Sequence, residues 1–161
     1  MSEPPESARS ALGRTRNVRR KEILQMVIQF TVDGTPPKKD GANSMWRKRT
    51  ELPKLKALRT AASREMRETS LPQRAVKLIV NIYADAKLGD LDNFITGICD
   101  ALQPAHSNTP IDENDWRDVP VEARPDRPIV FRDDQIISRI FAERTQPTDN
   151  RTYYDVMISW E

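Results

Sequence analysis

The stretch that decides the fold is residues 76–102, VKLIVNIYADAKLGDLDNFITGICDAL. Over Val76–Ala84 every second side chain is apolar, which predicts a β-strand with one wholly apolar face. From about Leu91 to Leu102 the apolar residues return every three or four positions, which is the spacing of a helix. Asp90 occupies the N-cap position of that helix. The stretch therefore predicts a strand followed, after a short acidic connection, by a helix.

The flanking sequence supplies the other elements of one domain. Ile23–Val32 predicts a first strand, and Pro53–Glu68 predicts a first helix with an apolar stripe. Two later strands are expected at Gln135–Glu143 and Thr152–Trp160, with one more short strand possible at Ile129–Phe131. The order β-α-β-α-β-β indicates a single α+β domain with a mixed or antiparallel sheet and two main helices.

Two segments stand apart from this periodic pattern. Residues 1–22 hold arginines, prolines and few large apolar side chains, so we expect a disordered basic arm before a folded domain at 23–161. Residues 103–128 form a long insertion rich in proline and acidic residues. Connections of this length are usually functional or mobile. The insertion is open to three interpretations: a lid, a partner surface that makes the chain an interaction module, or surface decoration.

Charge is distributed unevenly along the 161 residues, although the net charge is only +2. Residues 1–74 hold 17 basic and 8 acidic side chains (+9), whereas residues 75–161 hold 9 basic and 16 acidic ones (−7). A basic half joined to an acidic half suggests a polyanion-binding surface near a group of carboxylates. Two solvated faces of opposite sign would give the same arithmetic.

Composition excludes several classes of protein. The single cysteine, Cys99, rules out an intrachain disulfide and a Cys-rich zinc site, and the single histidine, His106, rules out a two-histidine site. No apolar run approaches the roughly 18 residues that span a bilayer, and no signal-peptide core is present, so we expect a cytoplasmic protein that contacts no membrane. Five glycines form no phosphate-binding loop, which argues against a nucleotide cofactor.

Four aspartates are the candidate chemical groups. Asp90 and Asp92 lie where the strand gives way to the helix, and Asp133 and Asp134 precede a later strand. If the two pairs converge, their oxygens suit Mg²⁺ or Mn²⁺, which activate water and stabilise charge on a phosphate. Each aspartate also has a structural interpretation, because Asp90 suits a helix cap and Asp133-Asp134 suits a solvated turn.

The two acidic motifs resemble those of a known family. Gly89-Asp90-Leu91-Asp92-Asn93 with Asp100-Ala101-Leu102 is similar to the GDLDN…DAL segment of RusA-type Holliday junction resolvases, and Arg132–Ile136 is similar to their DD-x-Q-[IV] segment. The resemblance covers about residues 23–145 in order and is specific only in these motifs. It implies a RusA-like fold and a homodimeric, Mg²⁺-dependent endonuclease that resolves four-way DNA junctions during recombination and repair.

The resemblance also assigns roles to residues. It makes Asp90 and Asp92 metal ligands, together with a third from the Asp133-Asp134 pair, because the residue between that pair and the glutamine is missing and both alignments remain open. Basic residues of the loop, the first helix and the strand-to-helix connection are the candidate DNA contacts: Lys38, Lys39, Arg47, Lys48, Arg49, Lys54, Arg59 and Lys87.

One position departs from the family in a way that affects function. The family carries a catalytically important lysine one turn after the second aspartate, where this chain has Thr96. Threonine cannot place a cation beside a developing phosphorane, and Lys87 is the nearest candidate substitute. The alternative function is therefore a branched-DNA-binding protein with weak or no nuclease activity.

Overall fold

The computed structural model describes residues 24–39 and 44–161, and it forms a four-stranded sheet with two helices. The order β-α-β-α-β-β is confirmed, and the expected basic arm at 1–22 lies outside the described residues. The strands and helices are β1 (Met26–Asp33), α1 (Leu52–Glu65), β2 (Val76–Tyr83), α2 (Leu91–Ala101), β3 (Ile137–Thr145) and β4 (Tyr153–Trp160).

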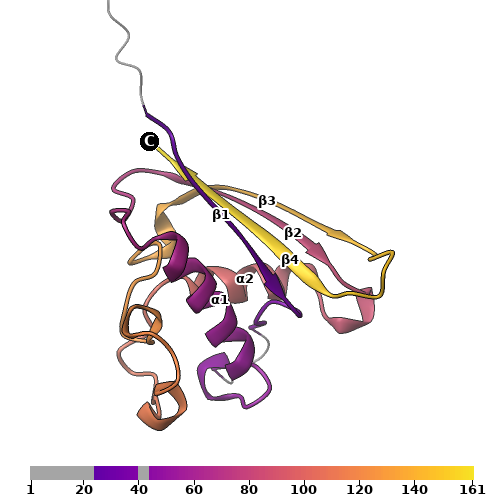
Figure 1. Cartoon of the computed structure of the whole chain (residues 1–161), viewed down its shortest axis with the longest axis horizontal. Helices are drawn as coiled ribbons and strands as arrows, with labels where there is room; N and C mark the ends of the chain where they lie inside the picture. Colours follow the sequence, from indigo (N-terminus) through magenta and orange to yellow (C-terminus); the bar gives the residue numbers. More distant parts are fainter. Residues whose placement is uncertain (1–23, 40–43) are drawn as a thin grey trace, which may run out of the picture.

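The sheet is mixed, with the strand order β1-β4-β2-β3. Strand β4 runs antiparallel to β1 and β2, while β3 runs parallel to β2. The alternation predicted for β2 is present, since Leu78, Val80 and Ile82 are buried and the residues between them are exposed or half-buried. Figure 1 shows α1 and α2 on the same face of the sheet, where they cover these buried side chains.

β1 and α1 differ by one to three residues at their ends from the sequence prediction, and the segment before β3 differs more. Strand β3 begins at Ile137 rather than Gln135, because Asp134–Ile136 form a short 3₁₀ helix that Asp133 caps. Ile129–Phe131 form no strand, although all three side chains are buried in the core. The amides of Ile129 and Val130 instead donate to the carbonyl oxygen of Leu102, at 3.2 and 3.1 Å. The apolar run at residues 129–131 therefore reflects burial in the core and not pairing in the sheet.

The insertion at 103–128 packs onto the domain around one buried arginine. The side chain of Arg59, in α1, is fully buried, and its guanidinium donates five hydrogen bonds of 2.5–2.8 Å. The acceptors are the carbonyl oxygens of Ala101, Gln103, Ala123, Arg124 and Arg127. These five bonds use every donor of the guanidinium. Arg59 therefore ties both ends of the insertion to α1.

The loop after β1 lies directly against α2. A Cβ atom at Gly97 would lie 2.0 Å from the carbonyl oxygen of Pro37, so only glycine permits this approach. The amide of Lys39 donates to the carbonyl oxygen of Asn93 at 3.2 Å. This contact fixes the start of the basic loop beside the helix that carries the first acidic motif.

Among the described residues, no helix has both the length and the apolar character needed to cross a membrane.

Candidate functional site at the two ends of helix α2

The N-terminal end of α2 carries the first acidic pair. Asp90 occupies the N-cap position with extended backbone angles (φ −83°, ψ 143°), yet its side chain makes no capping hydrogen bond. Asp92 lies in the first turn, and both side chains are exposed. Gly89 has φ +152°, and a Cβ there would lie 2.7 Å from the ring of buried Phe94. The carboxylate of Asp90 is therefore held at the surface and is not used to cap its own helix.

Thr96 and Lys87 flank this acidic pair. The Thr96 hydroxyl donates to the backbone carbonyl of Asp92 at 2.9 Å, which turns it back onto the helix. Lys87 belongs to the 3₁₀ helix Ala86–Leu88, and its amide donates to the Oδ1 atom of Asp85 at 2.9 Å. The side chain of Lys87 is exposed. Lys87 is thus the cation carried by the connection into α2, and Thr96 supplies none.

The C-terminal end of α2 carries the second acidic pair inside a hydrogen-bonded network. The Oδ1 atom of Asp133 accepts from the amide of Gln135 at 2.9 Å. The amide of Asp134 donates to Oε1 of Gln103 at 3.0 Å, and Nε2 of Gln103 donates to Oδ1 of Asp100 at 3.3 Å. An ion pair of 2.8 Å joins Lys39 to Asp100. Asp133 therefore caps the 3₁₀ helix that follows it, and the backbone of Asp134 is linked to α2 through Gln103.

The neighbouring carboxylates affect the protonation of Asp134 and Cys99. Burial raises the pKa of Asp134, the charges of Asp100 and Asp133 raise it further, and Lys39 opposes them. Burial, with smaller contributions from Asp134 and Asp100, raises the pKa of the Cys99 thiol to about 12. The thiol is protonated at neutral pH and buried, so Cys99 acts as a small core residue rather than a nucleophile.

The two acidic pairs lie at opposite ends of the helix. Asp92 and Asp100 are eight residues apart, which corresponds to about 12 Å along the axis. The charges that raise the pKa of Asp134 include neither Asp90 nor Asp92. Within residues 24–39 and 44–161, no three His, Cys, Asp or Glu side chains are grouped so that they could hold a metal ion. A single chain therefore does not bring the four predicted aspartates together.

The predicted DNA contacts fall into two groups. Arg59 is buried, and burial lowers its pKa to about 9, opposed by Asp126, so it serves the fold and leaves the candidate surface. Lys39 pairs with Asp100, and Lys54 pairs with Glu51 at 3.2 Å. Arg47, Arg49 and Lys87 are exposed, and Lys38 and Lys48 are half-buried. The exposed cations among them therefore come from the basic loop and from the connection before α2.

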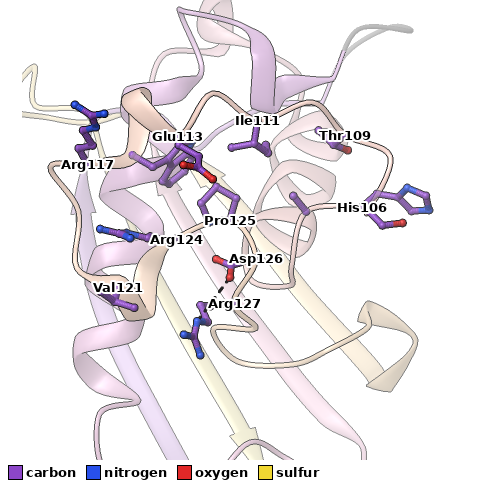
Figure 2. Close-up of a pocket in the computed structure, with 13 residues that line it drawn as sticks. His106, Thr109, Ile111, Glu113, Arg117, Val121, Arg124, Pro125, Asp126 and Arg127 are labelled. Carbon is purple, nitrogen blue, oxygen red and sulfur yellow. Dashed lines mark ion pairs between the residues drawn. The ribbon is translucent and has the colours of Figure 1, made fainter.

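The insertion encloses a hollow of about 680 Å³ that no sequence pattern predicts (Figure 2). Figure 2 shows Glu113, Pro125 and Asp126 grouped at its centre, with Arg117 and Arg124 on one side. Asp126 forms a long ion pair of 3.9 Å with Arg127. None of the four motif aspartates lines this hollow. The irregular, proline-rich sequence of 103–128 predicts a long loop, but it does not predict how that loop folds or that it encloses a hollow.

No family model matches the chain, and no curated protein matches it.

Proposed function

We propose that this chain is a Mg²⁺-dependent endonuclease of the RusA type that cleaves branched DNA, with Asp90 and Asp92 as its principal metal ligands. The observation that supports this proposal is the N-cap of α2. An aspartate at an N-cap normally accepts from the helix backbone, and Asp90 does not. The purely structural interpretation of Asp90 is thereby weakened, and an exposed carboxylate beside Asp92 is left for another partner.

Two carboxylates at one helix end are enough for such a role. Mg²⁺ keeps several waters and is commonly bound through one or two carboxylates together with substrate phosphates. When bound, Mg²⁺ or Mn²⁺ polarises a phosphodiester and lowers the pKa of water. Asp90 and Asp92 would hold the ion at the surface, where a DNA strand can reach it. The partial positive charge at the start of α2 would help to attract the phosphate.

The basic residues would bind the DNA backbone on either side of that position. Arg47 and Arg49 are exposed on the loop that precedes α1, and Lys87 is exposed three residues before Asp90. Lys38 and Lys48 belong to the same loop. Each phosphate contact should contribute about 0.9 to the slope of log affinity against log salt. Binding without base-specific contacts suits an enzyme that recognises the shape of a junction.

We assign the second acidic pair to the same reaction through a homodimer. The Asp133 carboxylate already caps Gln135, so Asp134 is the better ligand candidate of the two. Because no three acidic side chains of the described residues are grouped to hold a metal ion, we place Asp134 beside Asp90 of a second copy of the chain. A two-fold axis can bring unlike ends of the two copies together and gives two sites, one for each opposing strand.

A labelled synthetic four-way junction tests the nuclease proposal. The full-length protein should cut the junction with Mg²⁺ or Mn²⁺, should stop when EDTA is added, and should leave a linear duplex of the same sequence intact. Tight junction binding without metal-dependent cuts would overturn the nuclease and support the binding protein. Failure to distinguish the junction from the duplex would overturn both.

The second candidate, a branched-DNA-binding protein with little cleavage, is favoured by Thr96. Its hydroxyl is bonded to the backbone of Asp92, so this position provides no charge to a reacting phosphate. A Thr96→Lys variant that cuts faster than wild type would support this candidate, because it would show that the missing cation limits the reaction. Thr96→Val is the matched control, since it removes the hydroxyl without adding charge. Equal rates in all three proteins would show that position 96 is irrelevant and that Lys87 or another cation suffices.

A further inference from the structure

Strand β3 is an edge of the described sheet and is unusually apolar for an edge. It pairs with β2 on one side only. Ile140 and Phe141 are consecutive, and they are 46% and 59% exposed. An exposed edge offers a row of backbone donors and acceptors to another strand, and proteins usually protect it with charge or a covering segment. Exposed apolar side chains on such an edge indicate a partner strand.

The charges on β3 are arranged symmetrically around Phe141. Arg139, Phe141 and Glu143 share the face of the sheet that lies away from the helices, since they pair with Lys77, Ile79 and Asn81 of β2. Arg139 precedes Phe141 by two residues, and Glu143 follows it by two. A strand of this pattern is complementary to a copy of itself that runs in the opposite direction.

We propose that β3 pairs antiparallel with β3 of a second copy, with the two-fold axis at Phe141, so that the two sheets join into one of eight strands. Arg139 of each copy then lies opposite Glu143 of the other, and the two Phe141 side chains meet at the axis. Opposite charges directly across antiparallel strands stabilise the pair, and aromatic pairs do the same. On the helix-covered face, Ile140 lies opposite Ala142 of the second copy.

The charges select this register over its neighbours. A two-fold axis perpendicular to the sheet keeps each side chain on its own face, so only residues of the same face can lie opposite each other. The axis must therefore pass through a residue, and the nearest alternative registers place it one residue away. An axis at Ile140 sets Arg139 opposite Phe141, and an axis at Ala142 sets Glu143 opposite Phe141. Each alternative places a charge against the exposed ring and leaves both ion pairs unformed. Arg139 and Glu143 therefore disfavour pairing with unrelated strands and favour one symmetric pairing of β3 with its own copy.

The other edge of the sheet lacks this complementarity. On β1 the Thr31 hydroxyl donates to Asp155 at 2.5 Å, and Asp33 pairs with Arg151 at 2.6 Å. These polar groups are already used within the chain, and β1 carries no basic residue. Val27, which is 52% exposed on β1, supplies a matched control position.

A charge swap tests the register. The association constant would be measured by sedimentation equilibrium for wild type, Arg139→Glu, Glu143→Arg and the double variant. Each single change turns two attractive pairs into two repulsive ones and should weaken association about tenfold or more. The double variant should recover to within about threefold of wild type. A monomeric wild type, or a double variant as weak as the singles, would overturn the proposal. Circular dichroism of each variant confirms folding.

A cysteine at the axis tests the geometry directly. Phe141→Cys places two thiols opposite each other, and oxidised glutathione can convert them to a disulfide while it is itself reduced. Covalent dimer is expected for Phe141→Cys, and none for Val27→Cys or for wild type, whose Cys99 is buried. Dimer at position 27 with none at 141 would assign the interface to β1 instead and overturn the proposal.

This interface rests on the homodimer of the proposed function, but neither measurement uses cleavage. A protein that cuts junctions yet stays monomeric overturns the interface and the homodimeric role of Asp134, but leaves the nuclease itself standing. A protein that cross-links at position 141 yet never cuts DNA overturns the nuclease alone.

Discussion

The two ends of helix α2 carry the two acidic pairs, and they use their polar groups differently. At the N-terminal end the Asp90 side chain makes no capping bond and is exposed. At the C-terminal end Asp133 caps a 3₁₀ helix, Asp134 is linked through Gln103 to Asp100, and Arg59 binds the last carbonyls. Asp90 is thus left at the surface, whereas Asp133 serves the fold at the other end. Side-chain type alone did not distinguish these roles.

The largest expected effect is on stability at the C-terminal end. Arg59→Met should lower the free energy of unfolding by about 3–5 kcal/mol, because five carbonyl oxygens, two of them in fully buried bonds, lose their donors. Urea denaturation measures this change. Arg64→Met, at an exposed position of the same helix, should change it by about 0.5 kcal/mol or less. Equal losses in both variants would show that Arg59 does not hold this end together.

The next largest effect is on chemistry at the N-terminal end. Asp90→Asn should reduce metal-dependent junction cleavage at least about 100-fold while junction binding persists, since even outer partners of a metal matter 10- to 100-fold. Asp133→Asn keeps an oxygen acceptor for the Gln135 amide and should reduce cleavage by less than about tenfold. Initial rates on a labelled junction measure both. A larger loss in Asp133→Asn than in Asp90→Asn would reverse the roles assigned to the two ends.

A smaller effect on stability is expected to distinguish Asp133, which caps a helix, from Asp90, which does not. Asp133→Ala removes the acceptor of a 2.9 Å bond and should lower the free energy of unfolding by about 1 kcal/mol. Asp90→Ala removes no capping bond and should change it by less than about 0.5 kcal/mol. Thermal unfolding of the two variants in parallel would measure the difference. Should Asp90→Ala prove the more damaging, Asp90 would be acting as a cap in solution.

The order of elements was predictable because it depends on local patterns. The alternation of Val76–Ala84 and the three-to-four spacing after Asp90 are properties of consecutive residues, and both elements lie where the sequence placed them. The separation of the acidic pairs was not predictable, because it depends on the direction of β3. Since β3 is parallel to β2, its start lies beside Val76, whereas Asp90 follows the opposite end of β2. An antiparallel β3 would have placed both pairs at one edge.

The position of Arg59 on α1 indicated burial, although the many basic residues of this helix suggested an exposed, DNA-binding face. Arg59 lies four residues after Leu55 and three before Ala62, on the side of α1 that carries the apolar stripe. The basic character of this helix predicts a DNA contact at Arg59, but its actual partners come from residues 101–127, far along the chain. Those partners are backbone carbonyls, which no sequence pattern identifies. The shape of the insertion was unpredictable for the same reason.

The smallest expected effect is the pH dependence of stability at the C-terminal end. The pKa of Asp134 is raised above 3.8 by burial and by Asp100 and Asp133. The folded protein then keeps a proton that the unfolded chain has lost, so the free energy of unfolding falls as pH rises from 3.8 through the folded pKa. Asp134→Asn should remove this fall, which urea denaturation at pH values between about 3 and 7 would measure.

Asp118 provides a control of opposite sign for that measurement. The hydrogen bond from Lys56 lowers the pKa of Asp118 below 3.8, so its stabilising contribution is present above that value and is lost as pH falls. Asp118→Asn should therefore remove a loss of stability on acidification, whereas Asp134→Asn removes a loss on rising pH. If the Asp134→Asn profile runs parallel to wild type while Asp118→Asn departs from it, the carboxylates do not interact in solution. The C-terminal end of α2 would then be as open as the N-terminal end, and the contrast between them would fail.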